Sequence, residues 1–443
     1  YFAQQLREMN VAAWRAAHRR LYEHLCASTP NRDAPTLEDL QPLYQAVAHG
    51  CLAGMQQAAC DDVYRDRILR RNEFYSIKKL GALGSDLGAV TCFFEPPWRC
   101  VSPALSEPAQ AWLLNEASFC LRALGRLTEA LEPMRAGLEM GVRQENWKSA
   151  ARRANNLSGL ELTLGEVTDA LAVSAQSVTH ADRSGKDDWE NYIRTRTTHA
   201  DVLHQAGRRA EAKALFREAE RMQAEQQPHD PLLYSVQGFQ YGDLLLAVAE
   251  RAAWRTILPA PARSGVRGED LAEICRAVSE RAARTLKIAE QNHWLLDIAL
   301  GHLTSGRAAL YEAILTAADV HRARSDVEQA VAGLRRAGQQ EFTVRGLLTH
   351  AWLRCLFSTR TGPNSAQADL DEAWEIAERG PMRLFLADIH LHRARLFHAA
   401  TPYPWGSPQA DLTAARALIE HCGYGRRLEE LEDAEAVIGR ARI

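Results

Sequence analysis

The sequence has no long apolar segment, no strong excess of either charge and almost no strand-like alternation of Val, Ile and Thr. Its longest apolar runs, such as residues 244–249, are far too short to span a bilayer. The 53 Lys and Arg residues nearly balance the 56 Asp and Glu residues, so charge gives no reason to expect a membrane or nucleic acid as a partner. With 46% hydrophobic and 25% charged residues, the composition is that of a folded globular chain.

The nine cysteines are scattered along the chain and never stand in CxxC spacing. An odd number of dispersed cysteines predicts reduced thiols, and therefore a cytoplasmic protein. Free cysteine packs as a small apolar residue, and this is also our interpretation of Cys60 in "QAAC". Cys92 and Cys100 could pair only if they were oxidised, which we do not expect.

Signatures of catalysis are missing as well. The sequence holds no GxxxxGK[ST] phosphate loop, no HExxH, no GxSxG and no Gly-rich dinucleotide fingerprint. His390 and His392 are two residues apart and fall on different faces of a helix, so both cannot easily bind one metal. We therefore expect a non-enzymatic chain that uses no cofactor and no metal.

One basic stretch, "RILRRNEFYSIKK" at residues 67–79, concentrates five cations. We interpret it as a solvated helical face or a contact between domains, and a phosphate-contacting patch is the alternative.

Helical periodicity and an internal repeat dominate what is present. Three segments share a glycine, an alanine five residues later and a small residue seven after that, with another small residue seven before the glycine. The four positions are Ser118, Gly125, Ala130 and Gly137 in the first copy, Ser158, Gly165, Ala170 and Ser177 in the second, and Ala200, Gly207, Ala212 and Ala219 in the third.

This spacing predicts two antiparallel helices joined by a tight turn. Glycine at the turn can take a positive φ and end the first helix, and small residues at the crossing allow the two backbones to approach. Phe216 would fill the space between Ala212 and Ala219. The pattern resembles the tetratricopeptide (TPR) repeat, although the period of 40 to 42 residues between Gly125, Gly165 and Gly207 exceeds the usual length of about 34.

Weaker copies extend the repeat in both directions. Upstream, Gly54 and Ala59 fit the spacing, and downstream three segments repeat the spacing of the second helix: Ala330/Leu334/Ala337, Ala366/Leu370/Ala373 and Ala410/Ala414/Ala417. We therefore predict an all-α, right-handed superhelical solenoid of about eight TPR-like helical hairpins with a C-terminal capping helix.

The predicted organisation has four parts. They are a linker helix at 1–34, atypical helical repeats at 35–108, the TPR-like array at 109–423 and the capping helix at 424–443. Connectors rich in proline and glycine separate the helices.

The best candidate site is the inner groove of the superhelix, which the first helix of each hairpin lines in TPR arrays. Arginine and asparagine beside an aromatic side chain suit the carboxylates and main-chain amides of a peptide. The predicted groove residues are Trp112, Asn115, Phe119 and Arg122 on the first helix, Arg152 and Asn155 on the second, Arg194, Thr197, Asp201 and His204 on the third, and Phe239 and Asp243 on the fourth.

Residues 14–425 resemble the C-terminal TPR region of bacterial STAND NTPases, the NACHT-like or NB-ARC-like signal receptors. The resemblance rests on "WRAAHRRLYEHL", "LQPLYQAVAHGC", "NEFYSIKKLGALG", "LLNEASFCLRALGRLTEALEPMRAGLE", "VLHQAGRRAEAKALFREAE" and "DLDEAWEIAERG". "YFAQQLRE" at the start resembles the exit from a winged helix, so an ATPase domain is expected upstream in the same polypeptide. The chain departs from the family in "RTILPAPARSGVRGED" and "TPYPWGSPQ", which we interpret as contact loops specific to this receptor.

The resemblance implies a sensor that binds a trigger protein or peptide, such as a phage protein, and thereby relieves autoinhibition of the ATPase. The alternative is a constitutive TPR scaffold that docks a partner such as a protease or a transcription regulator. An enzyme concealed in the array has no support in the sequence.

Overall fold

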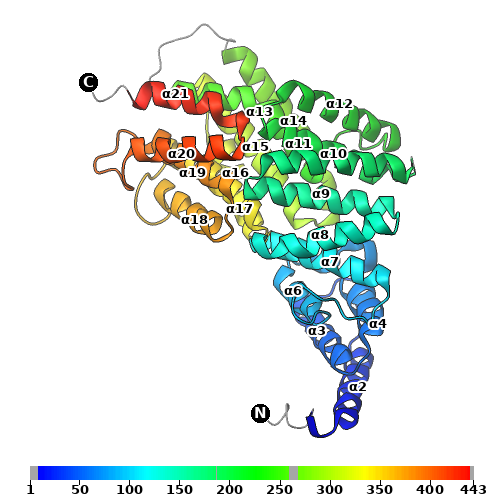
Figure 1. Ribbon diagram of the computed structural model, residues 1–443. Coiled ribbons are helices and arrows are strands. Elements are labelled where there is room, and N and C mark those ends of the chain that lie inside the picture. Colours follow the sequence, from blue (N-terminus) through cyan, green and yellow to red (C-terminus); the bar gives the residue numbers. More distant parts are fainter. Residues whose placement is uncertain (1–7, 186, 259–267, 440–443) are drawn as a thin grey trace. The chain divides into compact units, whose positions relative to one another are not determined.

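The computed structural model describes residues 8–185, 187–258 and 268–439 (Figure 1). The described residues are mostly helical and form no β-strand, the nearest feature being an isolated bridge between Phe94 and Val101. The predicted all-α helical solenoid is therefore confirmed. The chain divides into two compact parts, unit 1 (Tyr1–Gln144) and unit 2 (Glu145–Ile443), and each is described by itself below.

Unit 1 combines three elements of three or four residues and a π-helix with longer α-helices. Its elements are α2 (Val11–Ser28), α3 (Leu37–Leu52), α4 (Gln56–Ala58), the π-helix η1 (Ala59–Ile68), the 3₁₀ turn η2 (Arg71–Glu73), α5 (Tyr75–Lys78), α6 (Leu83–Thr91), α7 (Glu107–Ala123) and α8 (Leu127–Arg143).

Unit 2 is a series of long helices. They are α9 (Trp147–Leu164), α10 (Val167–Ser184), α11 (Trp189–Gln205), α12 (Arg209–Gln226), α13 (Ser235–Ile257), α14 (Gly268–Asn292), α15 (Leu295–Thr316), α16 (His321–Ala337), α17 (Gln340–Phe357), α18 (Ala366–Arg379), α19 (Arg383–Phe397), α20 (Pro408–Cys422), the 3₁₀ turn η3 (Gly425–Arg427) and α21 (Leu428–Ile438).

The hairpin turns have the conformation that the repeat pattern predicts. Gly125, Gly165 and Gly207 have φ of 76°, 90° and 84°, and each lies between the two helices of a hairpin. A side chain at these angles would be strained, so glycine ends the first helix here. The predicted boundary glycines are confirmed.

The predicted helix-crossing positions are also confirmed. Ala130, Ala170, Ala212 and Ala219 have no exposed surface, and Phe216 is equally buried between the last two. Phe216 stacks on Tyr241 of α13, with ring centroids 4.9 Å apart. Small residues bring the paired helices together, and one large ring fills the remaining space.

The upstream copy of the repeat differs from a regular hairpin. Gly54 has a φ of 82° and Ala59 is buried, but the following segment is a ten-residue π-helix, η1. Its buried residues recur about every four to five positions: Ala59, Cys60, Val63, Tyr64 and Ile68. The wider turn of a π-helix, which bonds residue i to i+5, suits this spacing better than an α-helix does.

In the last repeat the predicted register is wrong. On α20 the buried residues include Leu412, Ala415 and Ile419, whereas Ala410 and Ala417 are exposed. Alanine is small enough to stand on either face, so the larger Leu and Ile decide which side is buried. The middle of the predicted contact loop at 255–270 (residues 259–267) and residues 1–7 of the predicted winged-helix exit at 1–8 lie outside the described residues.

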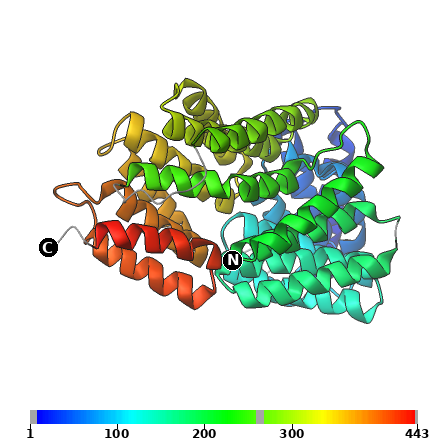
Figure 2. The ribbon, with the colours of Figure 1, turned by 90° about the horizontal axis from the view of Figure 1, so that it is seen from above.

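Unit 2 closes on itself. Seen from above, the C-terminal helices (red) return to lie beside helices from the start of the unit (green) (Figure 2). Arg383 of α19 donates to Glu166 between α9 and α10 at 2.6 Å, and Gly425 of η3 lies against Gly207 after α11. In an open solenoid each repeat contacts only its neighbours, so this contact between distant repeats is an additional feature of the fold.

Candidate functional site

The candidate site lies on the first helices of the unit 2 hairpins, α9, α11 and α13. Arg152 and Asn155 stand on α9, whereas Arg194, Thr197, Asp201 and His204 stand on α11. Phe239 and Asp243 stand on α13. Spacings of three, four and seven residues place each set on one face of its helix.

The remaining predicted residues lie on α7 of unit 1. Trp112, Asn115, Phe119 and Arg122 are all half-buried. Trp112 packs against Tyr64, with ring centroids 5.8 Å apart, and the Asn115 amide donates to Glu116. A role in binding stays a prediction for these four residues.

Arg152 and Arg194 are the two arginines among the predicted site residues of unit 2. Both side chains are half-buried, and neither forms an ion pair within the part of the chain that the structure describes. Nε of Arg152 has no hydrogen-bond partner there, and Arg194 makes only a long contact of 3.5 Å to Asn191. An anion could therefore be bound here without first breaking an internal ion pair.

The two guanidinium groups repel each other. Burial lowers the pKa of Arg194 from its usual range, and the neighbouring charge of Arg152 lowers it further, while the carboxylates of Glu190 and Asp188 act in the opposite direction. Burial and the same Arg152 charge lower the pKa of Arg153 to about 10. A cluster of like charges in a half-buried surface favours a bound carboxylate or phosphate, because the anion relieves the repulsion.

Asn155 stands one turn after Arg152 and is only 7% exposed. Its Oδ1 atom has no hydrogen-bond partner among the described residues. A buried polar atom without a partner is uncommon, and it marks a position where a ligand could complete the hydrogen bonding. Thr197, in contrast, donates to the backbone of its own helix at 2.9 and 3.1 Å.

The other predicted residues of α11 and α13 do not line an open groove. His204, Asp243, Phe239 and Asp201 are between 1% and 6% exposed. Asp201 accepts from Gln205 at 2.8 Å and from Gln240 at 3.1 Å, and Phe239 packs edge-on against Phe342. The prediction that these side chains line the inner groove is therefore not met by an open surface: Arg426 of the C-terminal segment covers Asp243, and α17 covers Phe239.

The interior of unit 2 contains a network of buried charges that the sequence analysis did not identify. Four arginines and four carboxylates take part, and each residue is between 2% and 8% exposed. They are Arg307, Arg395, Arg426 and Arg427 with Asp243, Glu250, Asp388 and Glu430. The formal charges cancel, which is the condition under which buried ions are tolerated.

Within the network Asp243 and Glu250 stay ionised. Arg307 donates to Asp243 at 2.7 Å, and Arg426 contacts the same carboxylate from the opposite end of the chain. Burial alone would raise the pKa of Asp243, but the guanidinium groups of Arg426 and Arg307 hold it well below its usual range. Glu250 behaves alike, because Arg427, Arg426 and Arg307 lower its pKa despite its burial.

His204 lies beside this charge network but carries no charge itself. Its Nε2 atom lies 3.8 Å from Asp243 and has no hydrogen-bond partner among the described residues. Burial lowers its pKa well below 6.5, and the charge of Arg426 acts in the same direction. His204 is therefore a neutral core residue in this conformation.

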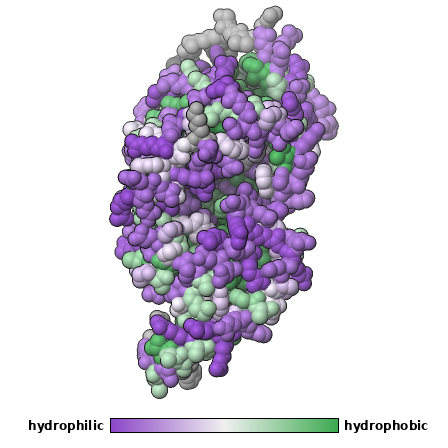
Figure 3. All heavy atoms as spheres, turned by 90° about the vertical axis from the view of Figure 1, so that its right-hand side faces the viewer, coloured by the Kyte–Doolittle hydropathy of each residue, from purple (hydrophilic) through white to green (hydrophobic). Residues whose placement is uncertain are grey.

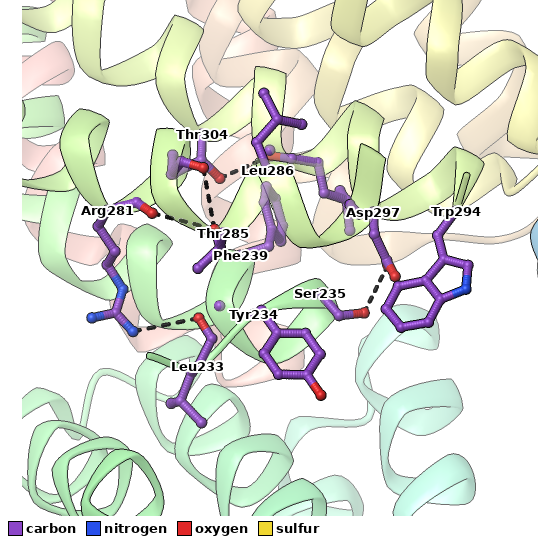
Figure 4. Close-up of a pocket in the computed structure, with 15 residues that line it drawn as sticks. Leu233, Tyr234, Ser235, Phe239, Arg281, Thr285, Leu286, Trp294, Asp297 and Thr304 are labelled. Carbon is purple, nitrogen blue, oxygen red and sulfur yellow. Dashed lines mark hydrogen bonds between the residues drawn. The ribbon is translucent and has the colours of Figure 1, made fainter. Parts of the chain in front are cut away.

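A small cleft opens between α13, α14 and α15 (Figure 4). Its volume is about 20 Å³, which is enough for a single water molecule. Arg281 donates to the carbonyl of Leu233 and Ser235 donates to Asp297 (Figure 4), whereas Nε of Arg281 has no hydrogen-bond partner among the described residues. This cleft is too small to be a ligand site by itself.

Two arginines of the basic stretch at residues 67–79 form hydrogen bonds within unit 1. Arg67 donates to the backbone of Cys26 and Thr29, and Arg70 donates to Arg32 and Asp33. These contacts favour the structural interpretation of the stretch over a phosphate-contacting patch. Cys60 is fully buried, as its packing interpretation predicts.

Other kinds of site receive no support from the described residues. No group of three or more His, Cys, Asp or Glu side chains is arranged to hold a metal ion in the parts that the structure describes. In the same parts, no helix combines the length and apolar character needed to cross a membrane. The face shown in Figure 3 is mostly hydrophilic with scattered hydrophobic areas, so polar contacts would dominate recognition there.

Comparison with known families agrees with the repeat pattern. A family model described as "Tetratricopeptide repeat" matches residues 149–225, which comprise most of α9, α10, α11 and α12. No curated protein matches the chain. TPR repeats form extended surfaces for other proteins, so residues 149–225 are a TPR region and a protein–protein interaction module.

Proposed function

We propose that this chain is the ligand-sensing part of a bacterial STAND NTPase receptor, in which the TPR region binds a trigger protein or peptide and relieves autoinhibition. The bound segment would be acidic and extended. The observation that carries the proposal is the Arg152 and Arg194 pair, which lies on the first helices of the matched TPR region and has no internal ion pair among the described residues.

The chemistry of the surface supports an acidic partner. Each guanidinium group can donate two parallel hydrogen bonds to a carboxylate, and Asn155 offers an amide to the peptide backbone. Such contacts supply orientation and specificity, and the area of the TPR surface supplies the remaining affinity.

Binding is tested with a fluorescein-labelled decamer of glutamate as the probe, titrated by fluorescence anisotropy. Arg152→Glu with Arg194→Glu should weaken binding at least tenfold. The matched control is Lys213→Glu with Arg221→Glu on the exposed side of α12, which changes the net charge equally. Equal weakening in both double variants would show non-specific attraction to total charge, and no binding to the wild type would remove the acidic-peptide assignment.

The receptor assignment is tested separately. A phosphate-loop ATPase encoded directly before Tyr1 would support the sensor, and ATP hydrolysis by the full polypeptide should rise when trigger is added. If the gene encodes no ATPase there, the scaffold for a protease or transcription regulator becomes the better assignment.

Charge reversal of Arg122 with Arg152 should also weaken trigger binding while the melting temperature changes little.

A further inference from the structure

The segment that closes unit 2 is a short turn between α20 and α21. The C-terminal turn comprises residues Gly423, Tyr424 and η3, and it carries Arg426 and Arg427. Both arginines are buried although they stand in a turn, at 7% and 6% exposure. Adjacent arginines in a turn are normally solvated, so their burial requires specific partners.

The partners of the C-terminal turn lie mainly on helices far away in the sequence. Arg426 donates to Glu250 of α13 at 2.9 Å, and it also contacts Asp243 and the side chain of Gln205 on α11. Arg427 donates to Glu250 at 3.0 Å and to Asp388 of α19 at 2.8 Å. The turn therefore inserts two cations into an acidic inner surface made by α13 and α19.

Backbone contact accompanies the ionic contact. A Cβ atom on Gly425 would lie 2.4 Å from the carbonyl oxygen of Ala206, and one on Gly207 would lie 3.0 Å from the backbone of Gly425. At the adjoining end of α20, a Cβ atom on Gly165 would lie 2.7 Å from Sγ of Cys422. The C-terminal turn thus packs directly on the turns that end α9 and α11, the first helices of the matched TPR region.

We propose that the C-terminal turn is an internal ligand of the TPR region. Arg426 and Arg427 occupy the acidic inner surface of Asp243, Glu250 and Asp388 and hold unit 2 closed. A partner reaches the inner faces of α11 and α13 only when the C-terminal turn leaves. The release of a binding surface rests on the proposed function, whereas the closing contact itself does not.

The internal-ligand role accounts for the burial of His204 and Asp243. Arg426 of the C-terminal turn satisfies the carboxylate of Asp243, whereas Asp201 accepts from Gln205 and Gln240.

With the C-terminal turn gone, Arg307 alone would face the carboxylates of Asp243 and Glu250, which leaves one negative charge in excess. This inner surface therefore favours a cationic group of a partner, whereas the Arg152 and Arg194 surface favours an acidic one.

The closing contact is tested by alkylation of cysteines in the full chain, with peptide-level mass spectrometry and N-ethylmaleimide as the probe. Cys422 is buried at the closing contact, and Cys275 is buried in α14 away from it. Arg426→Gln with Arg427→Gln should raise the alkylation rate of Cys422 at least tenfold while that of Cys275 changes less than twofold.

The matched control is Arg335→Gln with Arg416→Gln, which removes the ion pair of Arg335 with Glu372 and the half-buried pair of Arg416 with Glu435 between α20 and α21, and leaves Arg426 and Arg427 in place. Both alkylation rates should then stay at the wild-type value. If the alkylation of Cys422 and Cys275 were accelerated equally in the test variant, the fold would be loosened in general. If the alkylation of Cys422 were not accelerated, the arginines would not hold unit 2 closed. Either result overturns the proposal.

Gly425→Ala provides a second test that leaves every charge in place. Its methyl group would meet the backbone of Ala206, so it should displace the C-terminal turn and accelerate Cys422 alone. Wild-type rates in Gly425→Ala would contradict the internal-ligand assignment even if the double glutamine variant fails to fold. Because the assay uses no trigger, its failure would leave the Arg152 and Arg194 surface untouched.

Discussion

Unit 1 and unit 2 bury ionisable groups in different ways. In unit 1, the fully buried Asp86 accepts hydrogen bonds from the hydroxyls of Tyr44 and Ser76, and burial raises its pKa to about 7. In unit 2, Asp243 lies as deep but keeps its charge, because Arg307 and Arg426 are in contact with it. A carboxyl that meets only hydroxyls is held partly protonated near neutral pH, whereas one that meets guanidinium groups stays ionised.

This difference matters for what each unit can do. The Asp86 site is local to unit 1, since its partners come from neighbouring helices of a 144-residue unit. The charge network of unit 2 joins residues up to 183 positions apart and so ties α13, in the middle of the unit, to its C-terminal elements. Paired charges can hold a closed ring together, because removing either partner leaves an uncompensated buried ion.

The largest expected effect comes from deleting one buried charge in each unit. Arg307→Leu removes a cation that contacts Asp243 and Glu250, and we expect it to lower the free energy of unfolding of unit 2 by about 3–5 kcal/mol. Asp86→Asn at pH 6 should change that of unit 1 by about 1 kcal/mol or less, because the carboxyl is already largely neutral. Hydrogen exchange of α13 and α6 peptides measures both, and equal losses would show that the two units do not differ.

The next largest loss of stability is expected from replacing a turn glycine in each unit. Gly54 of unit 1 and Gly207 of unit 2 have nearly the same φ, 82° and 84°. A Cβ atom on Gly54 would meet only Arg15 at 3.9 Å, whereas one on Gly207 would meet the backbone of Gly425 at 3.0 Å. We expect about 1 kcal/mol of destabilisation for Gly54→Ala and about 3 kcal/mol for Gly207→Ala in urea unfolding. If the two costs agree, contact with the C-terminal turn adds nothing.

The pH dependence should have opposite signs in the two units. His392 of unit 2 is buried, which lowers its pKa from 6.5 to about 4, so the unfolded state binds more protons between these values. The stability of unit 2 should therefore fall by about 3 kcal/mol as the pH drops from 6.5 to 4.

Asp86 acts in the reverse direction, because its raised pKa lets the folded state keep a proton between pH 3.8 and about 7. Stability of unit 1 should fall as the pH rises through that window. The difference in unfolding free energy between wild type and Asp86→Asn, or between wild type and His392→Gln, isolates each slope. A difference that does not vary with pH would refute the corresponding assignment.

The smallest effect is expected at exposed ion pairs, where the units should behave alike. Arg126 with Glu129 in unit 1 and Arg208 with Glu211 in unit 2 follow their turn glycines at the same spacing and distance of 2.6 Å. Water screens such pairs, so Arg126→Ala and Arg208→Ala should shift the melting temperature too little to resolve by calorimetry. A clear fall in melting temperature for Arg208→Ala alone would show that ion pairs on the surface of unit 2 also contribute to its stability.

Much of the fold could be predicted because its signals are local. The glycine, alanine and small residue of each hairpin lie within 12 positions, and they specify one turn and one helix crossing. The candidate site was predicted less well. Arg152 and Arg194 lie on the expected face and remain accessible, whereas Asp201, His204 and Asp243 lie on the same kind of face but are covered.

The sequence by itself therefore determined the helices and the hairpin turns. Only the tertiary structure decided which charges are buried, because nothing local distinguishes "GRR" at Gly425 from an ordinary exposed turn. Its partners Gln205, Asp243 and Glu250 stand 176 to 221 residues away. They meet it only because small rotations between successive hairpins accumulate until the last repeat reaches the first.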